Sequence, residues 1–262
     1  MKEKKEYVWK FRPSSSPVCS RFIFFLKAYE GNPIITAEDA FVSDCYFEFG
    51  KAAHLVVQKW LGKTGLLYGD WICQKCKSIT SNCLRPVSCL KCACSEFTYK
   101  ELDFAAGTPF SSAHPDGFLL VEELSTKEAR CFSVLEIKTI SQEGFAGLTA
   151  QKPEHRIQAG IYALLGLQKG IRVVGVLFLY MNRNKPSQLK TFYQFVDPKI
   201  LITELKAFKV GQEAISTGKT PLGICRSEKD GIYCQFRNIC FSPSFQEKVR
   251  EAEASLKARQ SL

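Results

Sequence analysis

The sequence predicts an α/β domain in which helices flank a mixed β-sheet. Two observations come from strands: residues 131–140 and 171–181 are short runs dense in apolar, β-branched and aromatic side chains, as in buried strands. The third lies between them, where residues 153–168 repeat apolar side chains at helical spacing. Pro153 stands near the start of this helix and Gly170 just beyond its end. Alternating strands and helices of this kind build a mixed sheet covered by helices.

The other elements follow the same patterns. Residues 116–123 and 189–196 are predicted strands, and residues 46–62 are a predicted helix ending at Gly62. Residues 198–216 are a predicted helix, and residues 244–260 a charged surface helix. The chain of 262 residues fits one domain with insertions.

The composition favours a polyanionic partner. The net charge is +10, which suits nucleic acid, although such a charge also serves solubility. No apolar run approaches the roughly 20 residues that cross a bilayer, so no membrane partner is expected. The basic N-terminus has no apolar stretch behind it, so we expect no secretory signal and a cytoplasmic protein. In that reducing compartment its twelve cysteines favour metal binding over disulfides.

Two acidic residues and a lysine form a candidate active site. Asp116 begins one predicted strand, and Glu136 and Lys138 stand two apart on the next. Residues two apart on a strand share a face, so the neighbouring strand can bring Asp116 beside them. Two carboxylates with a backbone carbonyl suit Mg²⁺ or Mn²⁺. Since the pattern Glu-x-Lys is common, the alternative is a plain salt bridge between Glu136 and Lys138.

Three further residues extend this site. Gln158 and Tyr162 stand four apart on the predicted helix and therefore share one face. His54 lies on the predicted helix 46–62. Each also has an ordinary interpretation, because Tyr162 could be a core residue with its hydroxyl at the rim and His54 a hydrogen-bonded core histidine. We interpret His155 as a helix-start residue near the site and not as a metal ligand.

Four motifs in this order resemble the RecB-like PD-(D/E)XK nuclease family, which includes phage exonucleases and CRISPR adaptation nucleases. The motifs are Gly50-x-x-x-His54, Pro115-Asp116-Gly117, Glu136-Ile137-Lys138 and Gln158-x-x-x-Tyr162. The resemblance covers residues 17–241 and implies a restriction-endonuclease-like fold. It also implies that His54, Asp116, Glu136 and the Ile137 carbonyl bind Mg²⁺ or Mn²⁺. Lys138 would then be catalytic, and Gln158 and Tyr162 would contact DNA or support the site.

A first cysteine group predicts a zinc-ribbon insertion over residues 68–100. Cys73-x-x-Cys76 and Cys89-x-x-Cys92 are separated by twelve residues, and each pair can supply two thiolates to a tetrahedral Zn²⁺. The metal would fold a segment with little core of its own. Cys94 is an alternative to Cys92 as the fourth ligand, and Cys83 is surplus.

A second group contains Cys225, Cys234 and Cys240, with Cys19 as the preferred fourth ligand and Cys45 as its competitor. This grouping resembles iron–sulfur members of the same family, in which a cysteine near the N-terminus joins three near the C-terminus. The resemblance implies a [4Fe–4S] cluster in residues 218–245 that closes on the N-terminal region. The cysteine spacing departs from the usual family pattern, so zinc is the alternative at this site.

The combined expectation is a metal-dependent nuclease acting on DNA, with single-stranded DNA or DNA ends as substrate. Recombination or replication proteins are further candidate partners, and a viral chain would act in the host cytoplasm. The rival interpretation is an inert DNA-binding scaffold that uses the zinc ribbon and the basic surface. RNA is an alternative substrate that the sequence does not separate from DNA.

Overall fold

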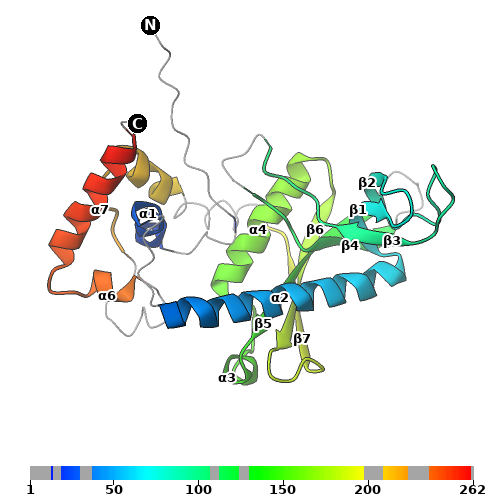
Figure 1. The fold of residues 1–262 in the computed structure, drawn as a ribbon, viewed down its shortest axis with the longest axis horizontal. Helices are drawn as coiled ribbons and strands as arrows, with labels where there is room; N and C mark the ends of the chain where they lie inside the picture. Colours follow the sequence, from blue (N-terminus) through cyan, green and yellow to red (C-terminus); the bar gives the residue numbers. More distant parts are fainter. Residues whose placement is uncertain are drawn as a thin grey trace, which may run out of the picture.

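A mixed seven-stranded sheet flanked by helices forms the centre of the protein in the computed structural model (Figure 1). The structure describes residues 13, 19–29, 37–106, 112–123, 130–197, 209–223 and 236–260. The main path of the sheet is β2-β1-β4-β5-β6-β7, and β3 pairs with β1 beside this path. Only β5 and β6 are parallel among these pairings. The bounds are β1 Leu67–Cys73, β2 Ile79–Leu84, β3 Phe97–Lys100, β4 Gly117–Glu123, β5 Arg130–Ile140, β6 Val173–Asn182 and β7 Leu189–Phe195.

Two long helices cover opposite faces of the sheet. Helix α4 (Pro153–Gln168) joins the parallel strands β5 and β6, and its buried residues share one core cluster with Phe132 and Val134. Helix α2 (Ala37–Thr64) lies on the other face, where its residues Ala53 and Val57 pack with Leu135 and Ile137 of β5. Because alternate strand residues point to opposite faces, β5 supplies both cores and is buried along nearly its whole length.

The central strands and α4 confirm the sequence prediction of an α/β domain with a mixed sheet. The prediction of the helix over 153–168 agrees with α4 at both ends. The run 171–181 is the central strand β6, which pairs with β5 and β7. Dense apolar runs and a proline at the helix start identify these elements, because both signals are local.

The predicted end of the second helix at Gly62 is wrong. Helix α2 continues to Thr64, and Gly65, with a φ of 75°, follows it in the left-handed conformation that ends many helices. Gly62 instead makes room for a neighbour, since an added Cβ would come within 3.0 Å of the Trp71 ring. The helix also begins earlier than predicted, at Ala37. The sequence does not indicate this first half, because several of its apolar residues are exposed and form no amphipathic pattern.

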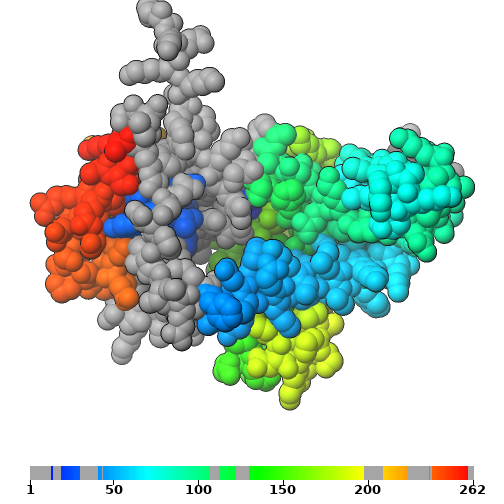
Figure 2. Space-filling view, in the orientation of Figure 1, coloured from blue at the N-terminus to red at the C-terminus, as the bar shows by residue number. Residues whose placement is uncertain are grey.

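The cysteine segment, residues 68–100, is part of the main sheet. Its strand β1 pairs with β4 at Leu67 and Tyr68, and with β2 and β3 farther along. Trp71 of this segment is only 2% exposed and packs in one cluster with α2 and β5, so the segment is anchored on the core of the main domain. Figures 1 and 2 show the segment at one end of the molecule, opposite the C-terminal helices.

The N- and C-terminal parts of the described chain pack together. Helix α1 (Ser20–Ala28) lies beside α7 (Phe245–Gln260), and α6 (Arg237–Cys240) precedes α7 (Figure 1). The Phe22 and Phe236 rings are 5.2 Å apart, and Ser255 donates a hydrogen bond to the Ala28 carbonyl. Residues 209–216 of the predicted helix 198–216 are helical, the helix continues to residue 217, and residues 198–208 lie outside the described chain. Among the described residues, no helix is both long and apolar enough to cross a bilayer.

A short helix and a loop lie beside the ends of β5 and β6. Helix α3 (Gln142–Ala146) follows β5, and the Ser141 hydroxyl caps it by accepting a hydrogen bond from the Gly144 amide. The loop before β7 is held by Asn182, which is fully buried and donates to the side chains of Gln142 and Gln188. These contacts hold the end of β6, where Asn182 pairs with Ile140 of β5.

Candidate active site and four-cysteine group

Six sequence-predicted residues come together between α2 and α4. Helix α2 supplies His54, β5 supplies Glu136 and Lys138, and α4 supplies Gln158 and Tyr162. Asp116 directly precedes β4, and the next residue, Gly117, pairs with Leu135 of β5. This register places Asp116 opposite Glu136, so both side chains point to the same face of the sheet.

Asp116 is held by two neighbours. Its Oδ2 accepts a hydrogen bond of 2.6 Å from the backbone amide of Ile137, and its Oδ1 lies 3.0 Å from Nδ1 of His54. Burial lowers the pKa of His54, but the hydrogen bond and charge of Asp116 outweigh burial and leave that pKa above its ordinary value. The imidazole and the carboxylate are therefore coupled, and the imidazole is oriented by this contact.

Glu136 and Lys138 form a buried ion pair. Glu136 is 0% exposed, and its Oε1 lies 2.6 Å from Nζ of Lys138. Burial, opposed by the charge of Lys138 and supported by that of Asp116, raises the pKa of Glu136 to about 7. Among the described residues, Oε2 of Glu136 has no hydrogen-bond partner. A fully buried carboxylate oxygen without a partner costs free energy unless a ligand compensates it, which fits a cation site.

Helix α4 orients the lysine. Lys138 donates a 3.0 Å hydrogen bond to Oε1 of Gln158, and Nε2 of Gln158 donates to the Tyr162 hydroxyl at 3.3 Å. Burial and the charge of Glu136 raise the pKa of Tyr162, so its hydroxyl stays protonated at neutral pH. The chain Glu136–Lys138–Gln158–Tyr162 therefore holds the ammonium group in one position. Tyr162 is both a core residue and a contact of the site, because it is 5% exposed and its hydroxyl accepts the hydrogen bond from Gln158.

Sequence reasoning missed Glu101. This residue follows β3, and one oxygen of its carboxylate lies within 4.8 Å of the ligand atoms of His54 and Asp116. These three residues are a group that could hold a metal ion, whereas Glu136 faces Lys138 beside them. Gln58, four residues after His54 on α2, donates to Oε1 of Glu101 at 2.7 Å and to the Asp116 carbonyl at 2.8 Å. No local pattern marks Glu101, because its position depends on the pairing of β3 with β1.

His155 lies near Lys138 without joining the candidate ligands. Its Nδ1 is 2.9 Å from the Tyr180 hydroxyl, which also accepts a hydrogen bond from the Lys152 amide. Burial, with the charges of Lys138 and Lys152, lowers the pKa of His155 to about 3. The imidazole is therefore neutral at physiological pH, at the first turn of α4.

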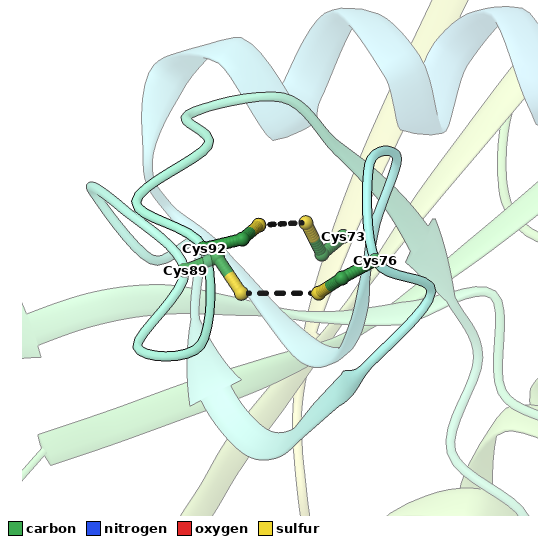
Figure 3. A group of neighbouring side chains, drawn as sticks. All are labelled: Cys73, Cys76, Cys89 and Cys92. Carbon is green, nitrogen blue, oxygen red and sulfur yellow. Dashed lines mark hydrogen bonds between the residues drawn. The ribbon is translucent and has the colours of Figure 1, made fainter.

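Four cysteines form a separate group that could bind a metal (Figure 3). The Sγ atoms of Cys73 and Cys92 are 3.5 Å apart, and those of Cys76 and Cys89 are 3.6 Å apart. All four thiols are free, so these contacts are not disulfides. A 3.3 Å contact between the Ser78 hydroxyl and Cys89 is the main cause that lowers the pKa of Cys89 to about 6. A lowered pKa favours the thiolate at Cys89. At Cys73, by contrast, backbone hydrogen bonds are outweighed by burial and by the contacts with Cys92 and Cys76, which raise its pKa to about 12.

The two halves of this group have the same backbone geometry. Lys77 follows Cys76 with a φ of 60°, and Ala93 follows Cys92 with a φ of 54°. Each of these amides donates a hydrogen bond to the carbonyl of the first cysteine of its pair, at 3.0 and 2.8 Å. Left-handed backbone is costly outside glycine, so its repetition indicates two turns built to present their sulfur atoms.

The surplus cysteines lie outside the four-cysteine group. Cys94 Sγ accepts a hydrogen bond from the Glu96 amide at 3.4 Å, and Cys83 Sγ contacts the Thr80 carbonyl at 3.8 Å. The geometry therefore favours Cys92 over Cys94 as the fourth member.

The second predicted cysteine group is only partly within the described chain. Cys19 directly precedes α1, Cys240 ends α6, and Cys45 is exposed on α2. Cys225 and Cys234 lie outside the described residues. The packing of α1 against α7 brings the regions around Cys19 and Cys240 to the same end of the molecule (Figure 1). The iron–sulfur cluster stays a prediction.

Comparisons of the chain with protein-family models, with curated proteins and with solved structures found no match.

Proposed function

We propose that this protein is a metal-dependent DNA nuclease of the RecB-like PD-(D/E)XK type, acting on single strands or DNA ends. One observation carries the proposal: residues from four separate elements converge on one buried site, although they are up to 108 positions apart between His54 and Tyr162. A plain salt bridge between Glu136 and Lys138 needs neither the Asp116–His54 contact nor the hydrogen bond from Lys138 to Gln158. The unpartnered oxygen of Glu136 supports a cation at this site.

The residues divide into two roles under this proposal. His54, Asp116, Glu136 and the Ile137 carbonyl would hold Mg²⁺ or Mn²⁺, since oxygen ligands with one imidazole suit these ions. When bound, such an ion polarises a phosphoryl oxygen and lowers the pKa of its water. Lys138, fixed by Glu136 and Gln158, would place its ammonium group against the negative charge of the phosphodiester.

We assign zinc to the four-cysteine group. A tetrahedral ion bound at about 2.3 Å to four thiolates holds sulfur atoms roughly 3.8 Å apart, close to the distances within this group. The contacts of 3.5 and 3.6 Å between paired sulfurs agree with that geometry. A [4Fe–4S] cluster held by Cys19, Cys225, Cys234 and Cys240 completes the proposal, with the cytoplasm as the site of action.

The test is cleavage of end-labelled single-stranded DNA with Mg²⁺ or Mn²⁺ by the full chain and its variants. We expect Asp116→Ala and Lys138→Ala each to slow cleavage by a factor of about 10² or more, because each removes a charge from the reacting centre. Lys169→Ala is the matched control, since it removes a lysine from the exposed end of α4. Cleavage by either site variant at the parent rate would refute the assignment.

The same assay separates the rival functions. Retained DNA binding with no metal-dependent cleavage by the parent protein would favour the inert scaffold. A matched RNA strand tests the choice of substrate, and faster cleavage of RNA would overturn the assignment to DNA.

A further inference from the structure

The carboxylate of Glu101 lies at the candidate cation site, although it belongs to none of the motifs found in the sequence. It comes from the residue directly after β3, whereas His54 and Asp116 come from α2 and from the start of β4. One ligand atom from each of these three side chains lies within 4.8 Å of the others. Two carboxylate oxygens and an imidazole nitrogen at this spacing are a donor set that divalent cations accept.

A buried amide holds Glu101 in this position. Gln58 is 5% exposed, and its Nε2 donates both to Oε1 of Glu101 and to the backbone carbonyl of Asp116. Gln58 and His54 are four residues apart on α2, so both reach the site from one helix face. A buried side chain that makes both contacts ties the two acidic residues together, despite the repulsion between their charges.

A second observation points to a cation. Glu136 is fully buried, lies opposite Asp116 in the sheet register, and has one oxygen with no hydrogen-bond partner among the described residues. Two carboxyl groups gather at the His54 imidazole, and the charge of Glu136, which is paired with Lys138, also acts on that imidazole. Burying several carboxylates close together costs free energy unless a positive charge lies between them.

The cysteine segment sets the position of Glu101. Strand β3 pairs with β1 from Phe97 opposite Cys73 to Lys100 opposite Asp70, and Glu101 follows Lys100. At the start of β3, the Gln74 amide donates to the Glu96 carbonyl at 2.9 Å. One continuous ladder therefore runs from the four-cysteine group to the candidate cation site.

We infer that Glu101 is a further ligand of the divalent cation at His54 and Asp116, supplied to the active site by the cysteine segment. The inference rests on the cation site of the proposed nuclease and adds to it a ligand that the four motifs do not contain. It also gives the cysteine segment a part in the chemistry of the site, in addition to any contact with DNA.

Binding of Mn²⁺, measured by calorimetry on the zinc-loaded full chain without DNA, tests this inference. We expect Glu101→Gln to weaken Mn²⁺ binding about tenfold or more, with the zinc content unchanged. Glu96→Gln is the matched control, because it removes an exposed carboxylate from the same segment and should bind Mn²⁺ like the parent. Asp116→Asn should lose binding, which identifies the site being measured.

Failure of the inference and failure of the proposed function are distinguishable. If the parent protein binds no Mn²⁺, the cation site of the proposed nuclease is refuted. If the parent binds Mn²⁺, Asp116→Asn does not, and Glu101→Gln binds like Glu96→Gln, only the role of Glu101 is refuted.

A second variant covers the case in which Glu101→Gln loses zinc through misfolding. Gln58→Met keeps the three ligand side chains and removes the amide that holds Glu101. The inference then predicts Mn²⁺ binding weakened severalfold with zinc retained, and parent-like affinity in this variant would overturn it.

Discussion

His155 makes the stability of the protein depend on pH in a way that one substitution can isolate. Its imidazole is buried beside Tyr180, and burial with the charges of Lys138 and Lys152 lowers its pKa from 6.5 to about 3. The folded protein therefore binds fewer protons at this group than the unfolded chain between these two pKa values. Stability from this group is present above pH 6.5 and is lost as the pH falls below it.

The size of the effect follows from the pKa difference. At pH 5, the unfolded imidazole is mostly protonated and the folded one is not, which costs about 1.36 kcal/mol for each of the 1.5 pH units below 6.5, or about 2 kcal/mol. Partial exposure of His155 reduces this to about 1–2 kcal/mol. His155→Gln keeps a polar side chain beside Tyr180 but cannot titrate.

The assay is urea unfolding of the parent and His155→Gln at pH 7.5 and pH 5. Between pH 7.5 and pH 5, the free energy of unfolding of the parent should fall by about 1–2 kcal/mol more than that of the variant. Other titrating groups, including Glu136, whose pKa is raised, contribute equally to both proteins and cancel in the difference. Equal losses in parent and variant would refute the assignment of a buried neutral imidazole.

Two further predictions concern the cysteine segment. Trp71→Ala should lower the free energy of unfolding by about 3–5 kcal/mol, because the ring is buried and packs 5.4 Å from the Tyr99 ring; a loss under about 1 kcal/mol in urea unfolding would contradict this packing. Cys76→Ser should reduce the zinc content measured by mass spectrometry, whereas Cys83→Ser, outside the four-cysteine group, should retain it; stoichiometric zinc in Cys76→Ser would exclude the site.

The sequence predicts the centre of the fold and several contacts of the site because their signals are local. Glu136 and Lys138 share a face through the two-residue period of a strand, and the apolar run around them marks that strand as buried. Gln158 and Tyr162 share a face through the helical period, and the structure joins them by a hydrogen bond. Such periodic patterns need no knowledge of what packs against them.

Other features depend on partners far away in the chain. Glu101 follows a strand with alternating half-exposed residues, and only the pairing of β3 with β1 brings it to the site. In the sequence, Gly62 resembles a helix end. In the structure, the missing Cβ leaves space for the Trp71 ring of the next strand. Helix α1 contains five consecutive apolar residues, 22–26, and which of them are buried depends on distant partners, because α7 and Phe236 pack against this helix.

The site assembles from contacts between distant parts of the chain, and this determines at what stage of folding the site forms. The hydrogen bonds from Gln58 to Asp116, from Ile137 to Asp116 and from Lys138 to Gln158 span 58, 21 and 20 residues. Non-local contacts form late, since the intervening loops must first be ordered. A ribosome that has not yet translated Gln158 therefore carries a chain whose lysine has no anchor on α4. Unfinished polypeptides lack the complete constellation, which restricts its chemistry to molecules that have folded.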